Sequence, residues 1–457
     1  MPRKLLTSAA LLPLALAACG GGIGTDKLPD DGPPVGTNAL QFRGRVPKNL
    51  IFLSIDTFRK DHVGVHGNLN LTPFLDDIAS QGVVLDDYMQ CSNWTFGSTT
   101  CTVAGRDNSD RGHLPRLNGG DEARTAVPEG TPFLASWLSD AGYFTSLISA
   151  NAWLSPKWGN TQGYDAFDEP GGNAYEVHRK GTASVREAYD RGEADKWFMH
   201  LHFMEPHAAY NPPEANVVGR DELDPWPEDL TDRQFHYDAR DTYSFLTETE
   251  RALLEQHLRR LYEGEVRTID ERLEDIWRDL ERDGFLDDTL VVIWNDHGEQ
   301  FWEHGKHTHA YSLHGEENDG FAIFWSRNII PGRYEGPTMS IDLVPTILDL
   351  FGVEMPEEVT GLPLGSAPAD RPRYAEALAR RGGINVAERD GWKMHFSWGG
   401  GVWVYDRNSD PEETINLYDP EDPTTLELWG LVRPKAEAMA DLVVNGSPSP
   451  NFPSTLP

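Results

Sequence analysis

The stretch Leu290-Val-Val-Ile-Trp-Asn-Asp-His-Gly-Glu299 is an apolar run that ends in an adjacent carboxylate and imidazole. Its apolar part is typical of a buried parallel strand, and ligands in open α/β sheets gather at the carboxyl ends of such strands. A second apolar run, Leu50-Ile-Phe-Leu-Ser-Ile55, ends in the same way at Asp56. The two runs therefore predict that Asp56, Asp296 and His297 meet at one edge of a parallel sheet.

Helical and strand-like patterns alternate along the chain, as expected for an α/β sheet covered by helices. Apolar residues recur at helical spacing over 262–280, and Gly284 ends this helix just before the Asp296 strand. The other predicted elements are helices over 131–141 and 339–351, a strand over 143–148, short strands over 393–396 and 402–405, and a terminal helix over about 428–444. A large α/β domain is therefore expected to precede a small antiparallel subdomain.

Thr95 stands at the expected start of a short helix, within the polar segment that runs from Cys91 to Gly105. A hydroxyl in this position feels the helix dipole, and coordination to a metal ion would bring its deprotonation near neutral pH. The local sequence alone fits a capping threonine. The two acid-terminated strands shift the interpretation to a nucleophile.

Several segments resemble the sulfatase family, which is part of the alkaline phosphatase superfamily. They keep the family order from about residue 49 to residue 417. The resemblance implies an alkaline-phosphatase-like α/β fold, with a mixed, mostly parallel sheet flanked by helices and a small C-terminal antiparallel-sheet subdomain. The matching segments are 56–61, Thr72-Pro73, Trp94-Thr95, 203–210, 296–299, 303–305, His309, 342–348 and 404–417.

The chain departs from sulfatases at the position of their nucleophile. Those enzymes convert Cys or Ser, in a Cys/Ser-x-Pro-x-Arg segment, to formylglycine, whereas the aligned residues here are Thr95-Phe-Gly-Ser-Thr99. Threonine carries a methyl on its β-carbon and cannot yield the aldehyde. A Gly-Lys-Trp-His segment that helps to hold sulfate in many sulfatases is replaced by Ser149-Ala-Asn-Ala152.

The remaining pattern is similar to the threonine-nucleophile branches of the superfamily, which act on phosphate esters. The resemblance implies that Thr95, as a metal-bound alkoxide, attacks phosphorus in line and that water then cleaves the phosphothreonine. Phosphodiesters are favoured, and sulfate esters stay open as substrates. The implied metal ligands are Asp56, Thr95, Asp296 and His297, which hold one or two divalent ions, zinc or manganese ahead of calcium or magnesium.

Four further residues are assigned roles by the resemblance. His207 and His309 are either ligands of a second metal or donors to substrate oxygens and the leaving group. Lys306 and Asn151 are the candidate substrate-binding residues. The other histidines in these neighbourhoods, His200, His202, His304, His307 and His314, are expected to be mostly structural or solvated.

The amino terminus resembles a bacterial lipoprotein signal. Arg3 and Lys4 precede an apolar stretch that is too short to cross a bilayer, and Leu16-Ala-Ala-Cys19 follows. We expect cleavage before Cys19 and its lipidation; the alternative is an ordinary signal peptide that happens to contain a cysteine. Gly20 favours an outer-membrane anchor facing the periplasm or the cell surface, since the acidic residue that often retains lipoproteins at the inner membrane is absent.

Cys91 and Cys101 are the only cysteines besides Cys19. An exported protein meets an oxidising compartment, so the two can form a bridge that flanks Thr95. Two buried free thiols are the alternative, because a sequence does not supply the required Cβ geometry.

The composition is strongly acidic, with 73 acidic against 40 basic residues and a net charge of −33. Such a surface repels nucleic acid and does not favour free docking on anionic lipid, so the lipid anchor is the only membrane contact expected. The expected substrate is a small-molecule or glycan ester.

The chain is therefore expected to be a metal-dependent ester hydrolase. A phosphoryl transferase acting on an envelope glycan or lipid and a non-catalytic binding lipoprotein are the alternatives. Transferases of the superfamily usually carry several membrane helices. A protein that has lost catalysis is expected to have lost Thr95, Asp56 or the 296–297 pair as well. The expected divisions are a signal peptide at 1–19, a flexible tether at 20–47, a catalytic domain at 48–368, a C-terminal subdomain at 369–445 and a tail at 446–457.

Overall fold

The computed structural model of the 457-residue chain describes residues 33–37, 39–67, 69–110, 126–379 and 382–443. The predicted signal peptide, the lipidation site Cys19, the first part of the tether and the tail lie outside these ranges. Among the described residues, no helix combines the length and the apolar character needed to cross a membrane.

The large sheet has nine strands in the order β12-β4-β11-β8-β3-β7-β5-β6, with β13 paired to β4. Strands β8, β3, β7, β5 and β6 run parallel to one another, whereas β11 is antiparallel to both β4 and β8. The mixed, mostly parallel sheet is therefore confirmed. Its strands are β3 (Asn49–Ile55), β4 (Val83–Met89), β5 (Phe144–Ser149), β6 (Ala166–Asp168), β7 (Trp197–Phe203), β8 (Thr289–Asn295), β11 (Asp319–Trp325), β12 (Gly332–Tyr334) and β13 (Thr338–Met339).

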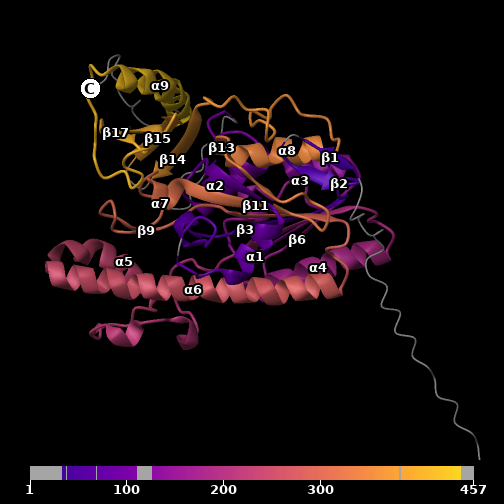
Figure 1. The fold of residues 1–457 in the computed structure, drawn as a ribbon, viewed down its shortest axis with the longest axis horizontal. Helices are drawn as coiled ribbons and strands as arrows, with labels where there is room; N and C mark the ends of the chain where they lie inside the picture. Colours follow the sequence, from indigo (N-terminus) through magenta and orange to yellow (C-terminus); the bar gives the residue numbers. More distant parts are fainter. Residues whose placement is uncertain (1–32, 38, 68, 111–125, 380–381, 444–457) are drawn as a thin grey trace, which may run out of the picture.

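Strand β3 lies at the centre of this sheet and is buried along its whole length. Its side chains alternate between two apolar cores: Ile51 and Leu53 join the core under α1, α4 and α6, and Phe52 joins the core under α2, α3 and α8. Figure 1 shows these two groups of helices on opposite sides of the sheet. Burial on both faces explains why successive residues from Leu50 to Leu53 are all apolar.

The helices are α1 (Pro73–Gln81), α2 (Thr95–Ala104), α3 (Leu134–Asp140), α4 (Ala174–Asp190), α5 (Arg233–Thr242), α6 (Glu248–Arg282), α7 (Gly315–Asn318), α8 (Leu343–Leu350) and α9 (Pro423–Val443). The longest, α6, begins well before its predicted start at residue 262. Thr247 caps it by accepting a hydrogen bond from the Glu250 amide, and the Glu250 carboxylate accepts one from the Thr247 amide. Gly284, with φ of 78°, follows its end as predicted.

The C-terminal subdomain is an antiparallel sheet in the order β14-β15-β16-β17. It packs against α9 around an apolar core that contains Phe396 and Trp429, and Figure 1 places it at one end of the large sheet. This unit confirms the predicted small subdomain. Its strands are β14 (Arg373–Ala379), β15 (Gly382–Arg389), β16 (Trp392–Ser397) and β17 (Val402–Asp406).

Two regions differ from the expectation. The end of the predicted tether forms strands β1 (Pro34–Gly36) and β2 (Gln41–Arg43), because Leu40 and Phe42 are fully buried in the core under α2 and α8. The segment before residue 244, for which the sequence pattern predicts no helix or strand, contains α5, whose Phe235 and Ala239 pack into the core under α6. Two short strands, β9 (Gln300–Phe301) and β10 (His307–Thr308), form a hairpin beyond β8.

Candidate active site

Asp56 and Asp296 each follow the end of a central strand. Strands β3 and β8 pair in parallel with Ile55 opposite Asn295, so the residues that come next leave the sheet side by side. The structure thus brings together Asp56, Asp296 and His297, as the two apolar runs predict. All three side chains are completely buried.

The three residues direct donor atoms at one point. His297 Nε2 lies 3.7 Å from Asp56 Oδ1 and 3.6 Å from Asp296 Oδ2. Within the described part of the chain, neither of these buried oxygens has a hydrogen-bond partner. The other ring nitrogen of His297, Nδ1, lies 2.9 Å from the Gly298 carbonyl, and donation there leaves Nε2 free as a ligand. Two unpartnered carboxylate oxygens beside a free imidazole nitrogen fit a divalent cation.

The pKa shifts of these three residues also favour a bound cation. Burial and the neighbouring charge of Asp56 raise the pKa of Asp296 well above its usual value. Burial also acts to raise the pKa of Asp56, but His207, His202 and His297 outweigh it and lower that pKa. Two adjacent buried carboxylates cannot both ionise unless a cation compensates them. Burial lowers the pKa of His297, which keeps the imidazole neutral and suitable for coordination.

Thr95 is the first residue of α2, and its hydroxyl faces the carboxylates. Thr95 Oγ1 donates to Asp56 Oδ2 at 3.3 Å and lies 3.5 Å from His297 Nε2. Asn151 Nδ2 donates both to Thr95 Oγ1, at 3.2 Å, and to Asp56 Oδ2, at 2.7 Å. The hydroxyl thus sits at a helix amino terminus, next to the candidate metal ligands. Asn151, expected to bind substrate, contacts the hydroxyl and the carboxylate themselves.

His202 belongs to this group as well, although it was expected to be structural. Strand β7 pairs with β3 so that His202 lies opposite Ser54. Its Nδ1 lies 2.8 Å from Ser54 Oγ and its Nε2 3.4 Å from Asp56 Oδ2. The run of mostly apolar residues over 197–203 is a signal from which a strand could have been predicted, but only the pairing of β7 with β3 places His202 against Asp56.

His207 and His309 lie together at the edge of the group. Their ring centroids are 5.2 Å apart, and the rings of His309 and His297 are 4.5 Å apart. His309 Nδ1 lies 3.1 Å from Glu299 Oε1, and the other Glu299 oxygen accepts from Tyr210 Oη. Glu299 therefore fixes the orientation of His309.

Lys306 lies in the turn between β9 and β10 and is exposed. It lines a cavity of about 570 Å³ together with Trp302, His304 and Trp403. Among the described residues, those that line this cavity do not include Thr95. The structure thus places Lys306 on the wall of this cavity.

Cys91 and Cys101 form a disulfide, which decides between the two alternatives left open by the sequence. Cys91 follows β4 and Cys101 lies in α2, so the bridge closes the segment that presents Thr95. Both cysteines are completely buried. The bridge ties the second half of α2 to the segment that follows β4.

A family model for sulfatases matches residues 48–353, which is more than half of the chain. An arylsulfatase of Clostridium perfringens is 22% identical over 448 residues, which cover 82% of this chain and 91% of that protein. A choline-sulfatase of Rhizobium meliloti is 29% identical over 181 residues, which cover 37% of this chain and 35% of that protein.

Two solved structures share the fold. One is a protein in complex with its substrate D-glucosamine-2-N,6-O-disulfate; it has a TM-score of 0.70, 18% identity, and coverage of 89% of this chain and 100% of that chain. The other is a phosphonate monoester hydrolase from Silicibacter pomeroyi, with a TM-score of 0.64, 20% identity, and coverage of 85% of this chain and 94% of that chain. At these identities the likeness establishes the fold.

Proposed function

The chain belongs to the sulfatase family of ester hydrolases, and on that premise we propose that it cleaves a phosphate or sulfate ester with Thr95 as the covalent nucleophile. One observation carries the proposal. Thr95 Oγ1 lies within hydrogen-bonding reach of Asp56 and Asn151, at the end of a helix that faces the unpartnered oxygens of Asp56 and Asp296.

Asp56, Asp296 and His297 would hold a divalent cation through Oδ1, Oδ2 and Nε2. When bound, the cation would lower the pKa of the Thr95 hydroxyl and neutralise charge on the ester oxygens. The ligand set combines hard carboxylate oxygens with one imidazole, which favours zinc or manganese.

The chain's own groups supply the steps of a double displacement. Thr95 Oγ1 loses its proton along the hydrogen bond to Asp56 Oδ2 and forms a bond to phosphorus or sulfur while the bond to the leaving oxygen breaks. Asn151 Nδ2 holds Oγ1 in position for this attack. The leaving oxygen takes up a proton from His207 and departs as an alcohol.

Water then cleaves the ester on Thr95. His309 takes the proton of the attacking water, because burial and the neighbouring His297 and His207 hold its pKa well below the usual value and keep it neutral. The bond from Thr95 Oγ1 to phosphorus or sulfur breaks, Oγ1 takes its proton back from Asp56, and the phosphate, phosphate monoester or sulfate leaves. His309 passes the water proton to solvent, and His207 regains its own from solvent.

The charge near Thr95 favours a substrate group with a single negative charge. The segment 149–152 carries no cationic side chain, and Lys306 lies on the wall of the neighbouring cavity. Phosphodiesters and sulfate monoesters carry one negative charge, whereas phosphate monoesters carry close to two at neutral pH. We place the phosphodiester first, since phosphorus is the usual target of threonine nucleophiles; the sulfatases and the phosphonate monoester hydrolase that resemble this chain support both ester classes.

The test compares nitrophenyl esters that differ only in the transferred group: a phosphodiester, a phosphomonoester and a sulfate. Metal-reconstituted protein is assayed beside Thr95→Ala and Thr95→Ser. We expect the phosphodiester to be cleaved fastest, Thr95→Ala to lose at least about 10³-fold in kcat and Thr95→Ser to retain turnover. Preferred cleavage of the sulfate would change the substrate and keep the nucleophile. Unchanged activity in Thr95→Ala would overturn the mechanism.

We also propose that Cys19 anchors the protein at the outer membrane, facing the periplasm or the cell surface. The signal-like sequence before it supports this location, and so does the disulfide between Cys91 and Cys101, because disulfides persist in oxidising compartments. Labelled fatty acid should enter the wild type and not Cys19→Ala when both are expressed in a bacterium that processes lipoproteins. Equal labelling of the two would contradict the anchor.

A further inference from the structure

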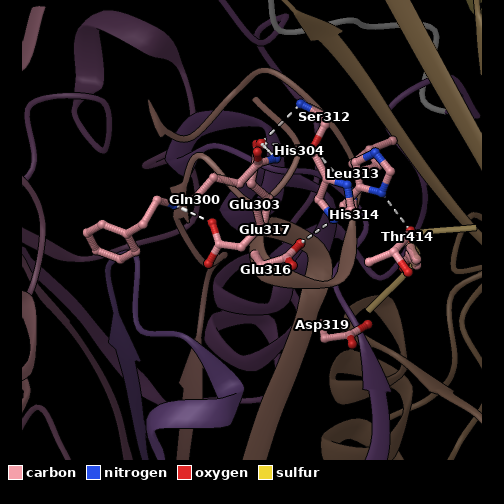
Figure 2. Close-up of polar contacts among 12 residues, drawn as sticks. Gln300, Glu303, His304, Ser312, Leu313, His314, Glu316, Glu317, Asp319 and Thr414 are labelled. Carbon is pink, nitrogen blue, oxygen red and sulfur yellow. Dashed lines mark hydrogen bonds and ion pairs between the residues drawn. The ribbon is translucent and has the colours of Figure 1, made fainter. Parts of the chain in front are cut away.

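A second group of potential metal ligands lies where the catalytic domain meets the C-terminal sheet. His314 comes from the loop before α7, His395 from β16, and Glu413 from the segment after β17. Glu413 Oε2 lies 2.8 Å from His314 Nδ1 and 2.9 Å from His395 Nε2. Figure 2 shows His314 grouped with His304 and Glu316, beside Thr414. Residues from two parts of the fold thus converge on one carboxylate oxygen.

His395 contributes a buried ring nitrogen, Nε2, to this group. Its side chain is almost completely buried, and its Nε2 lies 2.9 Å from Glu413 Oε2 in an approach that does not meet hydrogen-bond geometry. A cation between His395 and Glu413 would give this nitrogen a partner.

Cationic side chains hold the other oxygen of Glu413, Oε1. Lys393 Nζ donates to Oε1 at 2.9 Å, and Arg407 Nε lies 3.4 Å from the same oxygen. Arg407 is itself neutralised by Glu388 and Asp319. The carboxylate is thus held from one side, as supporting residues hold a metal ligand, while Oε2 faces the two imidazoles.

We propose that His314, His395 and Glu413 bind a second divalent cation of the zinc class, at a site separate from the one beside Thr95. Two imidazoles and one carboxylate are a ligand set that zinc prefers. Zinc–ligand bonds of about 2.0–2.2 Å at tetrahedral angles place donor atoms about 3.3 Å apart, so the contacts of 2.8 and 2.9 Å need to open by only about half an ångström.

The site would have one coordination position left for a small ligand. His314 and His395 both line the cavity of about 570 Å³ that also contains Lys306. Water or an anionic group of a bound molecule can therefore reach the ion from the cavity. The cation would also join the catalytic domain to the C-terminal sheet, since its ligands come from both.

The test measures zinc content and does not depend on ester cleavage, so its failure and a failure of the proposed function are distinguishable. Asp56→Asn/Asp296→Asn protein, which lacks both carboxylates of the first site, is stripped with a chelator, dialysed against zinc and analysed for bound metal. His395→Gln and His314→Gln are each added to this background. The matched control is His257→Gln, which removes a buried histidine that contacts the Asp224 carbonyl outside both groups.

We expect His395→Gln and His314→Gln each to remove one bound zinc per chain, and His257→Gln to remove none. Cobalt in place of zinc should give visible absorption bands that disappear with the same two substitutions. His314 lies at the cavity edge, so its variant tests the site if loss of the buried His395 disturbs folding, which circular dichroism reports. Equal zinc contents in His314→Gln, His395→Gln and His257→Gln would overturn the proposal.

Discussion

Thr95 Oγ1 and Asp56 Oδ2 lie 3.3 Å apart, although 39 positions separate the two residues in the chain. Strand β3 delivers the carboxylate and α2 delivers the hydroxyl, and both are almost completely buried. The contact places a hydroxyl at a helix amino terminus beside an ionised carboxylate. The hydroxyl can act as a nucleophile only if neighbouring side chains keep Thr95 and Asp56 in this position. Asn151 and His202 are two such side chains.

Asn151→Ala removes the amide that donates to both Thr95 Oγ1 and Asp56 Oδ2. We expect kcat to fall about 10- to 100-fold, with KM changed much less, because the amide positions the reacting groups. Asn328→Ala removes another buried asparagine, one that bonds the carbonyls of Arg43 and Arg45, and should leave both constants near the wild-type values. A rise in KM at constant kcat would assign Asn151 to substrate binding.

His202→Gln tests the contact of His202 with Asp56. We expect lower metal affinity and lower kcat, each by about 10- to 100-fold, because His202 steadies a candidate ligand. His200→Gln is the matched control: His200 lies on the same strand and also contacts Ser54, but its other ring nitrogen contacts Tyr164. Titration of metal into chelator-stripped protein gives the affinities. Equal losses of metal affinity and kcat in the two variants would attribute the effect to disturbance of β7 and not to the contact with Asp56.

Much of this site could be predicted from the sequence, because strand ends carry a local signal. An apolar run followed by an acid places Asp56 and Asp296 at the carboxyl edge of the sheet, and the glycine after 262–280 marks the end of α6. His202 carries no such signal. Its role depends on the pairing of β7 with β3, which joins residues about 150 positions apart.

Other differences have the same origin in long-range packing. Pro, Gly and Asp in the expected tether indicate an extended chain, but Phe42 is buried against the core under α8, and its backbone bridges to Ile329. The sequence around Phe42 does not indicate either the core under α8 or Ile329 as its partner. The disulfide likewise depends on how α2 lies against the end of β4, which spacing alone does not determine.

Cys91→Ala/Cys101→Ala should lower the free energy of unfolding by about 3 kcal/mol. A bridge with a sequence separation of 10 restricts the unfolded chain by about that amount in the loop-entropy model. Urea denaturation of the wild type and the variant gives the difference. Peptide mapping without reductant should recover the two cysteines in one linked species, and recovery of two free thiols from native protein would contradict the bridge.

Glu388→Gln should destabilise the protein in a pH-dependent way. Burial acts to raise the pKa of Glu388, but Arg373 and Arg407 lower it from 4.5 to about 2. The folded state therefore binds fewer protons than the unfolded state between these values. The stabilisation is fully present above about pH 4.5 and is lost as the pH falls toward 2.

We expect the variant to lose about 3 kcal/mol at pH 7 and the loss to shrink below pH 4.5. Glu427→Gln is the control, since Glu427 forms an ion pair with Arg389 while its side chain is 58% exposed; it should cost less than about 1 kcal/mol at any pH. Denaturant unfolding of the wild type and the two variants at several pH values measures these losses of stability. A loss for Glu388→Gln that stays constant down to pH 3 would contradict the assigned pKa.

The most direct test of the account is to trap the covalent ester on Thr95. Metal-reconstituted protein is mixed with an excess of the fastest nitrophenyl ester, quenched in acid within one turnover and digested for mass spectrometry. The account predicts that the peptide containing Thr95 gains the mass of the transferred phosphoryl or sulfuryl group, that fragmentation places this mass on Thr95, and that Thr95→Ala shows none. An active enzyme whose Thr95 peptide stays unmodified at every quench time, with product formed, would contradict the central claim.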